Sequence, residues 1–102
     1  MQVSLVIPVR NEAHSLSMLL DSLACQTRAP EEIVLVEGGS DDATLTQLRA
    51  AAAHDPRMVI LEAGPATPGR GRNLGIAAAR HEWIALTDAG TRLEPDWLER
   101  LC

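Results

Sequence analysis

Four apolar runs alternate with helical patterns along this chain, and this alternation is what most narrows the folds open to it. The runs cover residues 3–9, 32–36, 58–61 and 83–87, are rich in Val, Ile and Leu, and predict strands. Strands that alternate with helices form a mainly parallel sheet with right-handed crossovers. We therefore expect an α/β fold, a mainly parallel sheet with flanking helices.

The helices between these runs are predicted from apolar spacing and from capping residues. Asn11 can cap the first helix, and Asp41 or Asp42 can cap the second. A third helix is expected roughly over residues 72–80, and a fourth opens at 94–96 with Pro at its first position. The first helix has an apolar stripe at i, i+3, i+4 and i+7, formed by Leu16, Leu19, Leu20 and Leu23.

Composition limits the size and the class of the protein. With 102 residues, 46% of them hydrophobic, the chain can form one domain over residues 1–102 with a packed core. The net charge of -5 disfavours a nucleic-acid partner, but the cations are all Arg and suit a small phosphate-bearing ligand. Cys25 and Cys102 form neither a disulfide framework nor a zinc pattern, so we expect reduced thiols and a cytoplasmic protein. Neither a signal peptide nor a membrane segment is recognisable.

The fourth helical pattern has no visible end. Trp97, Leu98 and Leu101 are apolar at helical spacing, and no capping signal follows before Cys102. We expect a chain cut short, with one sheet edge and one apolar surface uncovered. Such surfaces pair readily, so self-association as a homodimer is expected.

Polar stretches follow three of the four predicted strands. Residues 8–12 read Pro-Val-Arg-Asn-Glu, residues 37–42 read Glu-Gly-Gly-Ser-Asp-Asp, and residues 87–90 read Thr-Asp-Ala-Gly. In an open α/β sheet, ligands bind outside the carboxyl ends of the strands. These stretches therefore predict one polar crevice.

The order of these motifs, with Gly-Arg-Asn-Leu-Gly at 71–75 between the second and the last, resembles the family 2 glycosyltransferases. Members of that family show P-V-x-N-E, V-D-D-G-S-x-D-x-T, A-R-N-x-G and D-x-D in this order. The resemblance covers nearly the whole chain. It implies a Rossmann-like GT-A fold, of which this chain would be the N-terminal, nucleotide-sugar-binding half.

The resemblance also implies roles for individual residues. The first stretch would lie along the nucleotide base, Glu37 would accept a hydrogen bond from that base, and Arg72 would lie near the nucleotide. Asp88 matches the first acid of the D-x-D and would contact the ribose or a divalent metal, Mg²⁺ or Mn²⁺. Gly90 replaces the second acid, which weakens the expectation of a metal. The implied substrate-binding residues are Pro8, Val9, Arg10, Glu12, Glu37, Arg72 and Asp88, with Asp88 also the metal ligand.

Structural roles compete with several of these assignments. Pro8 can simply end a strand, Glu12 can be a favourable charge in a first helical turn, and Arg72 can be solvated. For Asp41 and Asp42 we favour helix capping.

The expected function is transfer of a sugar, with inversion, from a nucleoside diphosphate sugar to the hydroxyl of an unknown acceptor. In the family the general base lies beyond the D-x-D, so no catalytic residue can be named and the chain alone should be inactive. A non-catalytic nucleotide-binding or assembly module is the alternative, favoured by Gly90. A weaker third reading is a phosphoacceptor-like α/β domain with an acidic pocket.

Overall fold

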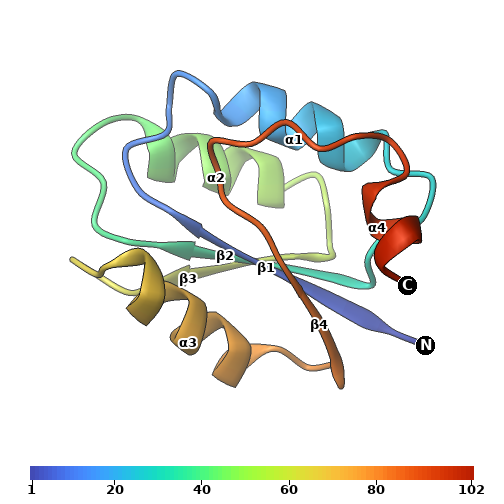
Figure 1. Cartoon of the computed structure of the whole chain (residues 1–102). Helices are drawn as coiled ribbons and strands as arrows, with labels where there is room; N and C mark the ends of the chain where they lie inside the picture. The colour runs from blue at the N-terminus through green and yellow to red at the C-terminus, as the bar shows by residue number, and fades with distance from the viewer.

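A computed structural model describes all residues from Met1 to Cys102 and contains one four-stranded sheet with helices on both faces (Figure 1). Strands and helices alternate along the chain, as the apolar runs predict. The elements are β1 (Val3–Val9), α1 (Leu16–Ala24), β2 (Glu32–Glu37), α2 (Thr44–Ala52), β3 (Met58–Glu62), α3 (Pro68–Ala78), β4 (Trp83–Leu86) and α4 (Trp97–Leu101).

The strands lie in the order β3-β2-β1-β4 and every neighbouring pair is parallel. The chain first moves outward from β1 to β3, and then crosses back to add β4 on the other side of β1. Because crossovers are right-handed, α1 and α2 cover one face, and the returning α3 covers the other (Figure 1). The expected parallel α/β fold is confirmed. The reversal creates a switch point at the carboxyl ends of β1 and β4.

Alternation along the central strands divides the core between the two faces. The odd-numbered residues of β1, such as Leu5 and Ile7, join the larger apolar cluster with the leucines of α1 and with Leu98 of α4. Val6 points to the opposite face and packs with Val34, beneath α3. The two faces of β1 are therefore both buried, which explains its continuous apolar sequence.

The bounds of two helices differ from those expected. Helix α3 begins at Pro68, four residues before the expected start, and the Thr67 side chain accepts a hydrogen bond from the Arg70 N–H at 3.2 Å. A Thr cap followed by Pro at the first helical position is a sequence signal that could have located this start. Helix α4 begins at Trp97, so Pro95 precedes the helix instead of occupying its first position.

Two observations concern the surface. Cys25 and Cys102 are exposed free thiols. None of the four helices combines the length and the apolar character that crossing a membrane requires.

Candidate functional site

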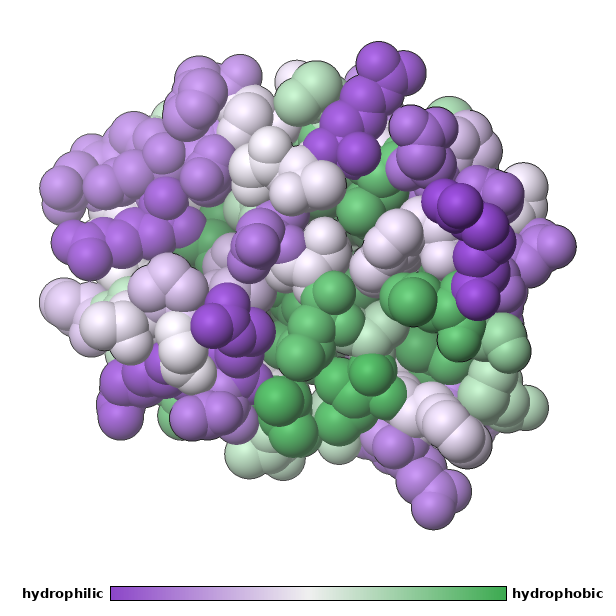
Figure 2. Space-filling view, in the orientation of Figure 1, coloured by the Kyte–Doolittle hydropathy of each residue, from purple (hydrophilic) through white to green (hydrophobic).

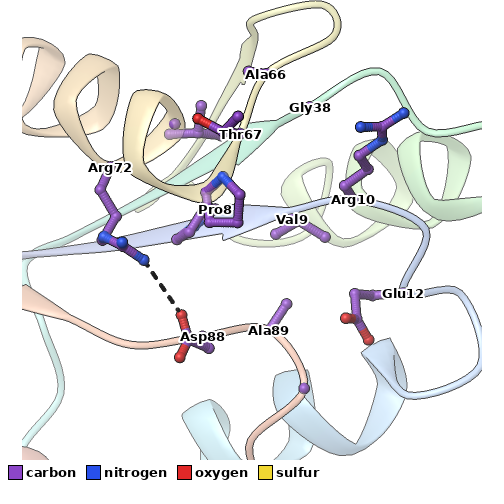
Figure 3. A pocket seen from close by; sticks show the side chains of 14 residues that line it. Pro8, Val9, Arg10, Glu12, Gly38, Ala66, Thr67, Arg72, Asp88 and Ala89 are labelled. Atoms are coloured by element: carbon purple, nitrogen blue, oxygen red, sulfur yellow. Dashed lines mark ion pairs between the residues drawn. The ribbon is translucent and has the colours of Figure 1, made fainter.

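A cavity of about 570 Å³ opens at the switch point (Figure 3). Its walls come from the carboxyl ends of β1, β2 and β4 and from the amino end of α3, and its volume is in the range of small-molecule sites. The lining residues are Pro8, Val9, Arg10, Glu12, Val36, Gly38, Ala66, Thr67, Pro68, Gly71, Arg72, Asp88, Ala89 and Gly90.

The structure brings most of the predicted site residues together in this cavity. Its walls include Pro8, Val9 and Arg10 from the end of β1, with Glu12 shortly after. Arg72 extends from α3 and Asp88 follows β4, so that residues far apart in sequence face one space (Figure 3).

Glu37 is not among the residues that line the cavity. Side chains alternate along β2, and it is Val36 that faces the cavity while Glu37 points to the other face. Glu37 is buried, 4% exposed, and its carboxylate accepts a hydrogen bond from the Ser40 backbone N–H. The structure therefore does not bring Glu37 together with the other site residues, and its contact with a base stays a prediction.

The amino end of α3 supplies lining residues that the sequence interpretation left out. Thr67, Pro68 and Gly71 form this wall. A β-carbon on residue 71 would lie only 3.2 Å from Cβ of Pro8, so glycine lets α3 approach the end of β1. The wall therefore depends on a residue with no side chain.

Asn11 holds the loop after β1 against the loop after β2. Its φ of 52° lies in the left-handed region, which Asn tolerates better than most residues. Its backbone N–H donates to Ser40 Oγ at 2.9 Å, and its Oδ1 accepts from the Asp41 N–H at 2.7 Å. The prediction that Asn11 caps α1 is wrong, because its side chain is used between the loops and the helix begins after Ser15.

Asp42 and Thr44 extend this connection. Thr44 Oγ1 accepts from the Glu12 N–H at 2.9 Å, and Asp42 Oδ1 accepts from the Thr44 N–H at 3.0 Å. The hydroxyl and the backbone N–H of Thr44 hold the pKa of Asp42 below its usual value. Asp42 thus holds the first residue of α2, but the N-cap residue is Ala43 and no side chain caps the helix, so neither Asp41 nor Asp42 occupies the capping position predicted for them. These contacts fix the backbone that carries Arg10 and Glu12.

Arg72 and Asp88 form the ion pair that crosses the cavity. Their Nη1 and Oδ1 atoms are 3.8 Å apart, and the two side chains are 40% and 74% exposed. Such an exposed pair contributes little to stability. Both groups are therefore available to a ligand.

Glu12 and Gly90 meet at the other end of the cavity. The Glu12 carboxylate accepts a hydrogen bond from Ser15 Oγ at 2.6 Å. A β-carbon on residue 90 would lie 3.8 Å from Glu12 Oε1. An acidic side chain at position 90 would thus bring its negative charge close to that of Glu12.

The fit of a divalent cation depends on the oxygen ligands that the site offers, since Mg²⁺ and Mn²⁺ prefer carboxylates. Of the carboxylates in the loop after β4, only Asp88 lines the cavity, and it faces the Arg72 guanidinium. Gly90 offers none, and Glu12 is engaged with Ser15. No three His, Cys, Asp or Glu side chains gather closely enough to hold a metal ion. These residues do not fit a cation held by the protein itself.

A parallel sheet of order β3-β2-β1-β4 with a polar cavity at its switch point defines an open α/β protein that binds its ligand at the carboxyl ends of the strands. The family model described as Glycosyl transferase family 2 matches residues 4–102. The chain belongs to this family.

Relatives and solved structures agree with this assignment. The succinoglycan biosynthesis protein ExoO of Rhizobium meliloti is 33% identical over 99 residues, which are 97% of this chain and 28% of ExoO. The crystal structure of S. aureus TarS 1-349 in complex with UDP-GlcNAc has a TM-score of 0.84 at 25% identity, over 99% of this chain and 30% of that one. The mannosyltransferase PcManGT from Pyrobaculum calidifontis, in complex with GDP-Man and Mn²⁺, has a TM-score of 0.76 at 26% identity. The match covers 87% of this chain and 27% of PcManGT. The chain thus spans less than a third of each of these proteins.

Proposed function

We propose that this chain is the donor-binding part of a glycosyltransferase that moves a sugar from a nucleoside diphosphate sugar to an acceptor hydroxyl. The observation that carries the proposal is the cavity at the switch point, where the motif residues of β1, α3 and β4 meet. Family membership supports the reaction type. The UDP-GlcNAc and GDP-Man in the structures of TarS and PcManGT support the ligand class.

The proposed roles follow from position and charge. The end of β1, Pro8 to Arg10, offers backbone groups and an apolar surface to the base. Asp88 is the carboxylate that can accept hydrogen bonds from ribose hydroxyls. Arg72 can offer two parallel N–H donors to a phosphate.

In the proposed reaction the acceptor oxygen attacks the anomeric carbon while the bond from that carbon to the diphosphate breaks. The configuration inverts, the acceptor proton passes to a general base, and negative charge grows on the leaving diphosphate. This chain offers Arg72 near that charge, but the base is expected outside the donor-binding part. We therefore expect the isolated chain to bind a donor without transferring the sugar.

Two measurements test the proposal. Titration calorimetry with UDP should show weak binding, and Asp88→Ala should weaken it about tenfold, as loss of a hydrogen bond to a charged group would. Asp21→Ala, an exposed acid on α1, is the matched control and should leave binding unchanged. Equal affinity of wild type and Asp88→Ala would remove Asp88 from the site.

The second measurement is an assay of sugar transfer by the isolated wild-type chain, with a panel of nucleotide sugars and acceptors. We expect no turnover above a heat-treated sample. Sugar transfer clearly above that control would contradict the expectation that the chain alone is inactive.

The second candidate is a non-catalytic nucleotide-binding or assembly module. Gly90, which removes the second acid of the D-x-D, favours it. A chimera in which this chain replaces the aligned segment of ExoO separates the two functions. Sugar transfer by a chimera that binds nucleotide supports the donor-binding function, and binding without transfer supports the module.

A further inference from the structure

We propose that the nucleotide site of this chain neutralises the diphosphate with arginine, chiefly Arg72, and therefore binds a nucleoside diphosphate without a divalent metal. The inference rests on the proposed function, because it concerns the same cavity. It follows from the poor fit between the side chains of the cavity and a metal ion.

With glycine at position 90, the cavity lacks the second acid whose negative charge a cation would offset. The missing β-carbon of Gly90 would lie 3.8 and 4.0 Å from the two Glu12 carboxylate oxygens. An acid at position 90 would therefore add a second negative charge beside Glu12, and a divalent cation would be needed to offset the pair. With glycine there, Asp88 is the carboxylate that this loop contributes to the cavity, and an arginine already faces it.

Arg72 can exchange its partner for a phosphate. Its distance of 3.8 Å from Asp88 is longer than that of a strong charge-assisted hydrogen bond, and both side chains are exposed. A diphosphate carries more negative charge than one carboxylate and accepts two parallel N–H bonds from a guanidinium. Because α3 is held close to the end of β1, Arg72 reaches the cavity from a rigid helix (Figure 3).

Arg10 adds a second positive charge. It lines the cavity and forms no ion pair with any carboxylate of the chain. The cavity walls thus carry two arginines against two carboxylates, Glu12 and Asp88. The dipole of the eleven-residue α3, whose amino end forms one wall, adds further positive potential. The two guanidinium groups and the amino end of α3 are thus the positive groups of the cavity that can face a diphosphate.

Titration calorimetry of the chain with UDP, in EDTA and in Mn²⁺, tests the inference. We expect dissociation constants that agree within about twofold in the two buffers. Arg72→Gln should weaken UDP binding at least tenfold in EDTA, as loss of a bond between charged groups would. Arg70→Gln is the matched control, since Arg70 is on the same helix, exposed and outside the cavity lining.

Two further measurements distinguish direct contact of Arg72 with the diphosphate from a purely structural role of Arg72. Uridine lacks the diphosphate, so its weaker binding should be the same for wild type and Arg72→Gln. Gly90→Asp should weaken UDP binding in EDTA and recover it in Mn²⁺, because the second acid both repels the diphosphate and completes a metal site.

The outcomes are distinguishable. UDP binding that occurs only with Mn²⁺ overturns the inference and leaves the proposed function standing. Equal UDP affinities of wild type and Arg72→Gln also overturn the inference. Absence of UDP binding in both buffers overturns the inference and the proposed function together.

Discussion

Gly75 of α3 is in such close contact with Val6 of β1 that a β-carbon on residue 75 would overlap Val6 Cγ1. The same atom would lie 2.9 Å from Cγ2 of Val36 on β2. Gly71, one turn earlier, packs in the same way against Pro8. The helix therefore lies directly on the sheet, and this close approach sets the position of Arg72 on the cavity wall.

Gly75→Ala should destabilise the chain by about 1–3 kcal/mol, the usual cost of overpacking a core. The added methyl has no space between α3 and the two central strands. Gly69→Ala is the matched control in the same helix, because nothing lies within 4 Å of its β-carbon position. That change should be neutral or stabilising by up to about 1 kcal/mol. Urea unfolding measures both, and equal stabilities would contradict the close contact.

Glu32 ties the start of β2 to the connection between α3 and β4. Only 1% of the residue is exposed. Its Oε1 accepts from Ser4 Oγ at 2.7 Å and from the Arg80 N–H at 2.9 Å, and its Oε2 accepts from Arg80 Nε at 2.9 Å. Each carboxylate oxygen thus has a donor.

Glu32→Gln should lower the free energy of unfolding by about 1–3 kcal/mol. The amide has no negative charge, and its NH₂ group would face a donor where a carboxylate oxygen now accepts a hydrogen bond. Glu62→Gln, which breaks the exposed pair with Arg49, should cost less than about 1 kcal/mol. Chemical denaturation at pH 7 checks the two variants. Similar losses of stability in Glu32→Gln and Glu62→Gln would show that the buried hydrogen bonds of Glu32 contribute no more than an exposed ion pair.

The contribution of Glu32 should also depend on pH. Burial raises its pKa, but the hydrogen bonds from Arg80 and Ser4 together hold the pKa below the usual value of 4.5. The folded pKa is lower than the unfolded one, so the stabilisation is present above about pH 4.5 and is lost as the pH falls through the folded pKa. The difference between wild type and Glu32→Gln should therefore shrink as the pH falls below 4.5. A stability difference between the two proteins that grows as the pH falls would contradict the lowered pKa of Glu32.

The central strands β1 and β2 could be predicted because both of their faces are buried and demand apolar residues. The edge strands β3 and β4 are partly exposed, and their apolar, strand-favouring composition is what predicts them. The expected run over residues 3–9 is β1 itself, and the other three strands begin or end within one residue of the expected bounds. The shared cavity was predictable for the same reason, because parallel strands bring their carboxyl ends to one edge.

Other features depend on tertiary contacts that the local sequence does not contain. Asn11 is a good capping residue, but Ser40 and Asp41 offer it partners across a loop. Glu37 follows an apolar strand like a site residue, but the alternation of β2 turns it away from the cavity. The direction of each side chain depends on register and on neighbouring loops.

The two properties of Asn11, its tolerance of a positive φ and its hydrogen bond to Asp41, can be separated by substitution. Asn11→Gly keeps the first and loses the second, whereas Asn11→Ala loses both. We expect Asn11→Ala to be less stable than Asn11→Gly by about 1 kcal/mol, the cost of left-handed backbone for a residue with a β-carbon. Thermal unfolding of the two variants decides this, and equal melting temperatures would rule out a strained backbone.

The surface beside β4 bears on the expected self-association. β4 pairs only with β1, so its outer edge has no partner strand. Trp83 and Leu86 of this strand are 57% and 44% exposed. Figure 2 shows green apolar side chains gathered over this strand and beside it. A groove of about 290 Å³ there is lined only by hydrophobic residues, namely Met1, Val3, Trp83, Ile84, Ala85, Leu98, Leu101 and Cys102.

We predict that two copies of the chain associate through this surface, with the β4 edges paired about a two-fold axis. Light scattering after size exclusion should give a mass that rises with concentration from 11.0 kDa toward twice that value. Trp83→Lys should keep the chain monomeric, since a charge at a strand edge opposes pairing. Val59→Lys places the same charge on an exposed position of β3, the other edge strand, and should not change the association. A constant mass of 11.0 kDa at every concentration would contradict the prediction. Loss of association in both variants would show that added charge anywhere on the surface prevents association, and not the change at β4.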